Sequence, residues 1–120
     1  MDPITRHHYE TLANNQAVTN PDGTVSTVYT IQVDIDGRPT LIPSVWDGEI
    51  LDEDAATQRA VASGIQWPTA DTHDELRYFD EKIHLGMEPI SASEAQRILE
   101  RENPPAERPL SDSARQRDIF

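Results

Sequence analysis

The sequence predicts an α+β fold: a long β-hairpin or small antiparallel sheet, packed by two or three short helices and followed by an extended C-terminal arm. Two observations predict it. From Val25 to Ile35 apolar and polar residues alternate, which is typical of a half-buried strand. Further along, Thr72 and Ser91 each stand three residues before a glutamate, the capping-box spacing that opens a helix.

The size of the chain favours one domain with polar extensions. It has 120 residues, of which 36% are hydrophobic and nine are proline, and an ordinary globular chain is roughly 45–50% apolar with glycine counted. We therefore expect a small folded body with arms. The predicted division is an N-terminal arm that carries a short helix (1–19), a core domain (20–86), an additional helix (87–102) and an extended C-terminal arm (103–120).

The short N-terminal helix is predicted over residues 2–12. Asp2 is a suitable N-cap, and Pro3 suits the first helical position because the N–H that it lacks would have no partner there. Ile4, His8 and Leu12 would share one stripe of this helix. So short a helix is marginal alone, so it must dock on something.

Turn residues bound the predicted strands. Asp36 and Gly37 form a strong hairpin signal between the strand 25–35 and a returning strand, 39–46. Pro43 lies inside the second strand, where it removes a ladder donor and predicts an edge strand or a bulge. The residues assigned to turns or to a helix stop are Asn20, Pro21, Asp22, Gly23, Gly37, Gly48 and Gly64.

Three helices follow the strands. The first is capped by Asp52, runs to Ser63 and is stopped by Gly64; the second runs from the Thr72 cap to Leu85; the third runs from the Ser91 cap to about Glu102. The residues predicted to face inward are, helix by helix, Ala56, Ala60 and Val61; Leu76, Phe79 and Ile83; and Ala95, Ile98 and Leu99.

Charge argues against several classes of partner. The chain has 22 acidic and 10 basic side chains and a formal net charge of −12, and residues 34–88 alone carry −9. Direct nucleic-acid binding needs a basic surface, so it is not expected. No apolar run approaches the ~20 residues that span a bilayer, and no signal-peptide core follows Met1, so no membrane role is expected.

The sequence offers no set of residues typical of catalysis. It has no cysteine, no Gly-x-Ser-x-Gly motif and no glycine-rich phosphate loop. Its acidic residues gather at helix starts, where capping explains them. The histidines, His7, His8, His73 and His84, lack the i, i+4 spacing of zinc ligands on a helix, so they are expected to be solvated or to face a partner. We therefore expect no enzyme, no catalytic residue, no bound metal and no cofactor.

The aromatic residues are candidates for an interaction surface. Trp46 and Trp67 flank turns, and Tyr29 lies on the long strand. One interpretation is that they cap the core; the other is that a tryptophan anchors a protein interface, as buried aromatics often do. In the C-terminal arm the apolar candidates are Leu110, Ile119 and Phe120.

Residues 20–84 resemble a small domain that recurs in bacteriophage and prophage proteins. The resemblance is carried by the run Asn20-Pro21-Asp22-Gly23-Thr24-Val25-Ser26-Thr27-Val28 and by Leu41-Ile42-Pro43 with Val45, Asp47, Gly48 and Ile50. An acid-capped helix ending in Gly64 and a second helix opening at Asp71-Thr72 and closing at Ile83-His84 complete it. The chain departs from the pattern at 65–68, where Ile-Gln-Trp-Pro replaces a glycine- and aromatic-containing turn.

The resemblance implies a virion-associated protein and brings no catalytic residues. The leading hypothesis is a non-enzymatic structural or interaction protein of the capsid, neck or tail, made in the host cytoplasm and located in the virion. Its arms would bind other virion proteins in a homo- or hetero-oligomeric assembly. Two alternatives stay open: an acidic inhibitor of a host defence protein that imitates nucleic acid, and an accessory module of a cell-wall-degrading virion machine.

Overall fold

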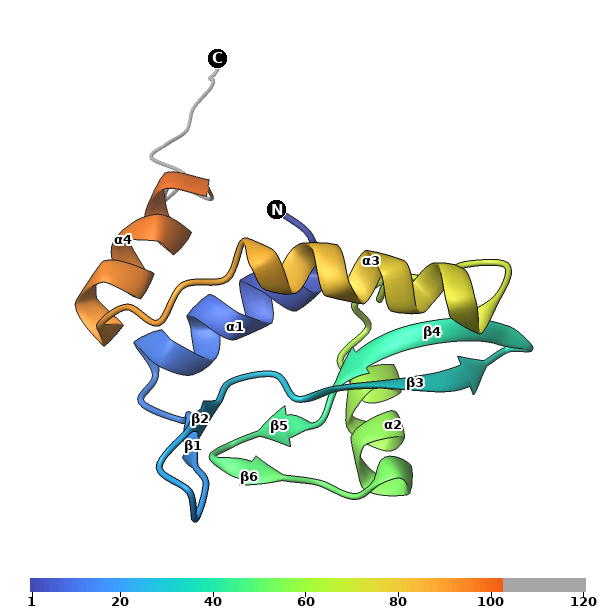
Figure 1. The fold of residues 1–120 in the computed structure, drawn as a ribbon, viewed down its shortest axis with the longest axis horizontal. Helices are drawn as coiled ribbons and strands as arrows, with labels where there is room; N and C mark the ends of the chain where they lie inside the picture. The colour runs from blue at the N-terminus through green and yellow to red at the C-terminus, as the bar shows by residue number, and fades with distance from the viewer. Residues whose placement is uncertain (103–120) are drawn as a thin grey trace.

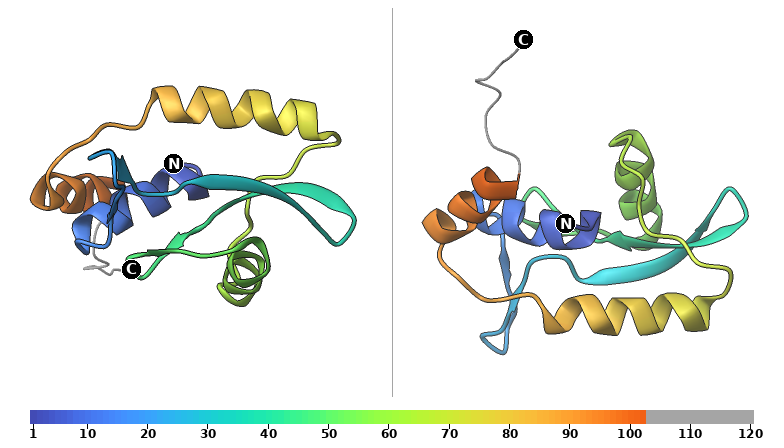
Figure 2. Two further views of the ribbon diagram at one scale, coloured as in Figure 1. Left: turned by 60° about the horizontal axis from the view of Figure 1, so that its bottom comes forward. Right: turned by 90° about the horizontal axis from the view of Figure 1, so that it is seen from above.

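A computed structural model describes residues 1–102 and shows the predicted α+β fold. Its centre is the antiparallel hairpin of β3 (Thr30–Ile35) and β4 (Arg38–Pro43), with α2 (Glu53–Ala62) and α3 (His73–Leu85) on opposite sides (Figures 1 and 2). The remaining elements are α1 (Pro3–Ala13), β1 (Val18–Thr19), β2 (Val25–Ser26), β5 (Val45–Trp46), β6 (Glu49–Ile50) and α4 (Ala92–Glu102).

Three two-stranded antiparallel sheets account for the strands, and two of them turn on an Asp-Gly pair. Both residues of each pair have positive φ: 53° and 77° at Asp36 and Gly37, and 52° and 82° at Asp47 and Gly48. Two successive residues at positive φ define the turn whose twist matches a two-residue hairpin. The hairpin predicted at Asp36-Gly37 is therefore confirmed, and the turn predicted at Gly48 joins the strands of a second hairpin.

The predicted strand 25–35 is interrupted, which corrects the sequence-based expectation. β2 ends at Ser26 and β3 begins at Thr30, and between them Tyr29 has a φ of 41°. The carbonyl of Val28 accepts hydrogen bonds from the backbone N–H groups of Ser44 (2.8 Å) and Val45 (3.3 Å). Because of these bonds, residues 27–29 do not belong to the β3–β4 ladder. The apolar–polar alternation of the sequence continues through them, so the alternation does not reveal the break.

The returning strand is likewise divided, into β4 and β5, with Ser44 between them. Pro43 removes no ladder donor, contrary to the expectation. Leu41 N donates to Pro68 O (2.8 Å) and Ala70 N donates to Pro39 O (3.2 Å), so these β4 positions point away from β3. Because backbone direction alternates along a strand, Pro43 points the same way, and its missing N–H would not have faced β3.

Capping residues begin the helices where the sequence predicts. The side chains of Asp2, Asp52 and Thr72 each accept a hydrogen bond from the backbone N–H three residues later, at 2.8–3.1 Å. At α4 the capping box is reciprocal: Glu94 N donates to Ser91 Oγ and Ser91 N donates to Glu94 Oε1, both at 3.2 Å. Local sequence therefore determines these helix starts.

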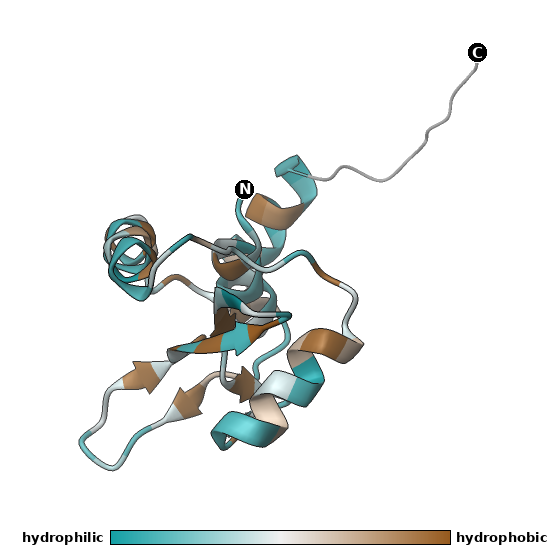
Figure 3. Ribbon diagram, turned by 90° about the vertical axis from the view of Figure 1, so that its right-hand side faces the viewer, coloured by the Kyte–Doolittle hydropathy of each residue, from teal (hydrophilic) through white to brown (hydrophobic). Residues whose placement is uncertain are grey.

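The core lies where α2, α3 and α1 meet the hairpin. Its most completely buried apolar side chains include Leu41 and Ile42 of β4, Ile4 of α1 and Leu76 of α3. In Figure 3 hydrophobic residues (brown) and hydrophilic residues (teal) are interspersed along the helices. On α2 the predicted inward residues Ala56 and Ala60 are buried, whereas Val61 is 57% exposed, so its assignment to the apolar face is wrong.

Helix α1 is part of the body rather than an arm. Ile4 is fully buried in the core, and His7, His8, Tyr9 and Thr11 are also buried. Figures 1 and 2 show α1 between the hairpin and α4, so the additional helix 87–102 packs on the N-terminal helix. The segment predicted as an N-terminal arm therefore supplies a wall of the core. The predicted C-terminal arm, 103–120, lies outside the described residues.

Candidate functional site

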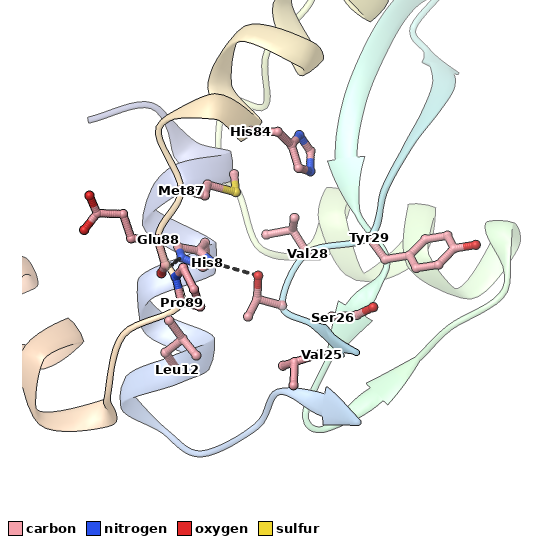
Figure 4. Close-up of a pocket in the computed structure, with 11 residues that line it drawn as sticks. His8, Leu12, Val25, Ser26, Val28, Tyr29, His84, Met87, Glu88 and Pro89 are labelled. Atoms are coloured by element: carbon pink, nitrogen blue, oxygen red, sulfur yellow. Dashed lines mark hydrogen bonds between the residues drawn. The ribbon is translucent and has the colours of Figure 1, made fainter. Parts of the chain in front are cut away.

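An open groove of about 390 Å³ lies between α1, the β2–β3 connection and the segment that joins α3 to α4 (Figure 4). Most of the surface exposed in the groove is apolar, with Val28 and Met87 toward α3 and Leu12, Val25 and Pro89 at the other end. The polar lining residues are His8, Ser26, Thr27, Tyr29, His84 and Glu88. A groove of this kind can receive an apolar side chain of a partner and orient it with a few polar groups.

Tyr29, a predicted interaction residue, stands at the rim of the groove with its side chain directed outward (Figure 4). The residue is 56% exposed, and its φ of 41° is unfavourable for a bulky side chain. Such a conformation costs of the order of 1–3 kcal/mol. The side-chain hydroxyl of Ser44 donates to the Tyr29 carbonyl and helps to hold the backbone in place. The ring is thus presented to solvent by backbone geometry that the surroundings maintain.

His8 of α1 links the other two walls of the groove through hydrogen bonds to Thr27 and Glu88. Its Nε2 lies 2.9 Å from the carbonyl oxygen of Glu88, which can only accept, so Nε2 carries the proton. Its Nδ1 then accepts from the hydroxyl of Thr27 at 2.6 Å. Desolvation by burial lowers the pKa of His8 below its usual 6.5; the bond to Glu88 opposes this effect and the nearby His84 adds to it. Neutral His8 therefore has both nitrogens occupied, and its role is structural.

His7 performs a similar role on a neighbouring face of α1, since successive residues of a helix point about 100° apart. Its Nε2 donates to the carbonyl of Val45 at 2.7 Å, and its ring meets Trp46 edge-on at 4.7 Å between centroids. Burial lowers the pKa of His7, the bond to Val45 raises it and the charge of Arg59 lowers it, with smaller opposing effects of Asp47 and His8. The expectation that these two histidines are solvated or face a partner is wrong, because helix α1 turns both into the body.

His7, Trp46 and Trp67 form an aromatic cluster. The ring centroids of the two tryptophans are 6.1 Å apart, with the rings edge-on. Trp67 is 7% exposed and donates from Nε1 to the Ala60 carbonyl at 3.0 Å, so it caps the core. Trp46 is half-buried and donates to the Pro43 carbonyl. Arg59 lies over the Trp46 ring at 4.9 Å and pairs with Asp47 at 2.6 Å. Of the three aromatic candidates within residues 1–102, Tyr29 has the ring most open to a partner.

The other two histidines are paired with carboxylates at the surface. His73 contacts Asp34 at 3.1 Å and Gln32 at 2.9 Å, which joins α3 to β3. His84 contacts the carboxylate of Asp80 at 3.1 Å on its own helix and borders the groove. The Nδ1 of His84 that makes this contact also lies 2.9 Å from the backbone carbonyl oxygen of Asp80.

The remaining predictions concern a metal site, a membrane span, the turn residues and the C-terminal arm. Among the described residues no group of three or more histidines or carboxylates could hold a metal ion, and no helix is long and apolar enough to cross a membrane. Asn20, Pro21, Asp22 and Gly23 form the tip of the β1–β2 hairpin, where Asn20 N donates to Thr24 O at 2.8 Å. Gly64 follows α2 at a φ of 72°. Leu110, Ile119 and Phe120 lie outside the described residues.

The groove itself was missed by sequence reasoning. Its walls come from three segments far apart in the chain, and the Thr27–His8–Glu88 connection spans up to 80 residues. No periodic pattern encodes such a meeting. Comparison with protein-family models, with curated proteins and with solved structures finds no match to this chain.

Proposed function

We propose that this protein is a non-enzymatic structural and interaction protein of a bacteriophage particle, in the capsid, neck or tail, that binds neighbouring virion subunits. The observation that carries the interaction role is the apolar groove with the strained, solvent-directed Tyr29 at its rim. Strain of this kind is retained where surrounding structure maintains it, often at functional sites. Tyrosine is also enriched among the residues that dominate binding energy in protein interfaces.

The setting in a phage particle is supported by the resemblance of residues 20–84. Its motifs fall on the β1–β2 tip, on β4 and β5 and on α2 and α3, which form one continuous body with the groove. The non-enzymatic role is supported by the engagement of all four histidines in structural contacts within residues 1–102. Of the four, His8 is buried with both ring nitrogens hydrogen-bonded, so neither nitrogen is free to take up a substrate proton.

Mass spectrometry of purified particles tests the proposal most directly. Particles from a strain that encodes the chain are banded on a density gradient, treated with high salt and digested. We expect the chain to remain with the particles at a constant ratio to the major capsid protein. Its absence from the particles, together with salt-sensitive capture of a host nuclease or DNA-binding protein, would contradict the proposal and favour the nucleic-acid mimic. Co-sedimentation with purified cell wall would favour the accessory module.

A pair of tyrosine variants tests the groove. Tyr29→Asn removes the ring and places at positive φ a residue that tolerates it, so the fold is retained. Tyr78→Ala removes a ring that is 63% exposed on the outer side of α3 and away from the groove. We expect at least a tenfold loss of particle incorporation for Tyr29→Asn and none for Tyr78→Ala. Equal incorporation of both variants would remove the groove from the proposal.

A further inference from the structure

The two edges of the central hairpin differ, and the difference indicates a binding site. The outer edge of β4 is covered by the segment after α2: Leu41 N donates to Pro68 O, and Ala70 N donates to Pro39 O. The outer edge of β3 is paired with no strand within residues 1–102. Unpaired strand edges readily accept a further strand.

The register identifies which groups are free on β3. Gln32 is opposite Leu41, and Asp34 is opposite Pro39. Since Leu41 and Pro39 direct their hydrogen bonds away from β3, Gln32 and Asp34 direct theirs away from β4. Thr30, opposite Pro43, follows the same alternation. The N–H and C=O groups of these three residues therefore line the open edge.

A cavity of about 440 Å³ adjoins this edge on the side of α2. Val33 contributes its apolar surface, and Glu53 and Asp54 at the start of α2 contribute acidic groups; the carboxylate of Asp34, a further lining residue, is paired with His73 of α3. A strand added beside β3 would direct alternate side chains toward this cavity. Side chains with an aliphatic stem and a basic end, above all arginine, fit a site with an apolar floor and an acidic rim.

We propose that residues 115–120 of one copy of this chain add as a third strand to the free edge of β3 in a second copy. The choice of a second copy rests on the proposed function, in which the segment 103–120 binds neighbouring subunits. The segment reads Arg115-Gln116-Arg117-Asp118-Ile119-Phe120. In a strand, Arg115, Arg117 and Ile119 share one face, so two guanidinium groups and one aliphatic group would meet the cavity together.

The charge of residues 103–120 and the length of the segment 103–114 both favour residues 115–120 as the added strand. Residues 1–102 carry the whole formal charge of −12, whereas residues 103–120 have three acids and three bases. Direct pairing of two β3 edges would bring two acidic bodies together, while the arginines of 115–117 reduce that repulsion. The twelve residues 103–114 span up to about 43 Å when extended, enough to place the following strand beside a neighbouring body.

Exchange of this kind joins two different surfaces, a donated strand and an accepting edge. Such a head-to-tail contact forms a ring where the rotation between copies closes, and an open chain where it does not. We therefore expect self-association that increases with protein concentration. We also expect it to weaken at high salt, because exposed charges contribute to it.

Complementation between two full-length variants tests the proposal. The donor variant, Arg115→Glu with Arg117→Glu, replaces attraction to the acidic rim by repulsion. The acceptor variant, Gln32→Pro, removes an outward N–H without removing a bond to β4. Each alone is expected to self-associate at least tenfold more weakly than the unmodified chain in sedimentation velocity. Mixed in equal amounts they are expected to form a dimer and nothing larger, because one functional edge and one functional segment remain.

Controls separate this result from misfolding. Gln32→Ala keeps the N–H and removes only the side chain, so it should self-associate like the unmodified chain. Circular dichroism and thermal melting establish whether Gln32→Pro is folded. If it is not, Glu53→Lys with Asp54→Lys serves as the acceptor variant. Combining that pair with the two arginine-to-glutamate changes in one chain should restore association, since the charges are exchanged.

Hydrogen exchange provides the second readout. In the self-associated protein the amides of Thr30, Gln32 and Asp34 should exchange at least tenfold more slowly than in the donor variant. A monomeric unmodified chain, a mixture that stays monomeric, or protection of these amides in a monomer would each overturn the proposal. Strand exchange is measured in solution, and presence in particles is measured by mass spectrometry, so either can fail without the other.

Discussion

The four histidines form two pairs that differ in their surroundings. His7 and His8, on α1, are 8% and 5% exposed, and each bonds a backbone carbonyl far away in sequence. His73 and His84, on α3, lie at the surface beside Asp34 and Asp80. The first pair fastens separate segments to one another, whereas the second contributes exposed ion pairs, which are usually weak. The comparison shows that burial, rather than residue type, decides what a histidine does here.

The largest effect should come from removing the buried tie beneath the groove. His8→Ala leaves the Glu88 carbonyl and the Thr27 hydroxyl without their partner and opens a cavity, so we expect a loss of about 2–4 kcal/mol of unfolding free energy. His84→Ala, the surface control, should cost less than about 1 kcal/mol. Urea denaturation followed by tryptophan fluorescence measures both. Similar losses for the two variants would contradict the division into buried and surface pairs.

His7→Phe should have the next largest effect. Phenylalanine keeps a ring against Trp46 but leaves the Val45 carbonyl without its donor, so we expect a loss of about 1–3 kcal/mol. The same denaturation experiment measures it. A stability equal to that of the unmodified protein would mean that packing of the ring, and not its hydrogen bond, is what matters at this position.

Stability should fall in mildly acidic solution because of the buried pair. Burial lowers the pKa of both His7 and His8, so below about pH 6.5 the unfolded chain binds protons that the folded protein does not. Their contribution is complete above pH 6.5 and is lost as the pH falls toward their lowered pKa values. Each histidine contributes a slope of up to about 1.4 kcal/mol per pH unit.

Denaturation at a series of pH values between 7.5 and 5 measures this slope. The variant His7→Phe should show a shallower dependence than the unmodified protein, since one of the two groups no longer titrates. The variant His84→Ala serves as the matched control at the surface. A profile that is flat over this range would show that the buried histidines bind protons equally well in both states.

The smallest effect is expected at the surface pair. Asp34→Asn removes the charge that faces His73 and keeps a side chain of the same shape, so we expect a change of less than about 1 kcal/mol. Added salt should reduce whatever difference remains, because the pair is exposed to solvent. Thermal melting at low and high salt measures it. A larger loss that persists in salt would indicate that the bond from α3 to β3 is important for packing.

Local signals in the sequence predicted most of the elements. The Asp-Gly turns, the caps Asp52, Thr72 and Ser91, and the α+β class follow from interactions within a few residues, and the structure has them. The break at Tyr29 could not be predicted in this way. It depends on Val28 and Tyr29 bonding to residues 44 and 45, which lie well beyond the reach of strand periodicity.

The groove and the position of α1 were also beyond local signals. The short N-terminal helix was predicted to dock, but the sequence did not indicate on which elements. The adjacent residues His7 and His8 are polar and were expected at the surface or facing a partner, and only the packing around α1 shows that both are buried. Of the predicted interaction residues, Tyr29 borders the groove and Trp67 is buried. Only the packing of distant segments separates these outcomes.

The sequence by itself determined the turns, the helix starts and the acidity of the body, because φ preferences, capping and charge act on single residues and their near neighbours. The tertiary structure decided which polar residues are buried, which edge of the central hairpin is covered and where an apolar surface stays open. Those features arise when segments as far apart as residues 8 and 88 meet. Their free energy depends on desolvation and on hydrogen bonds between these segments, and neither exists until the chain has folded.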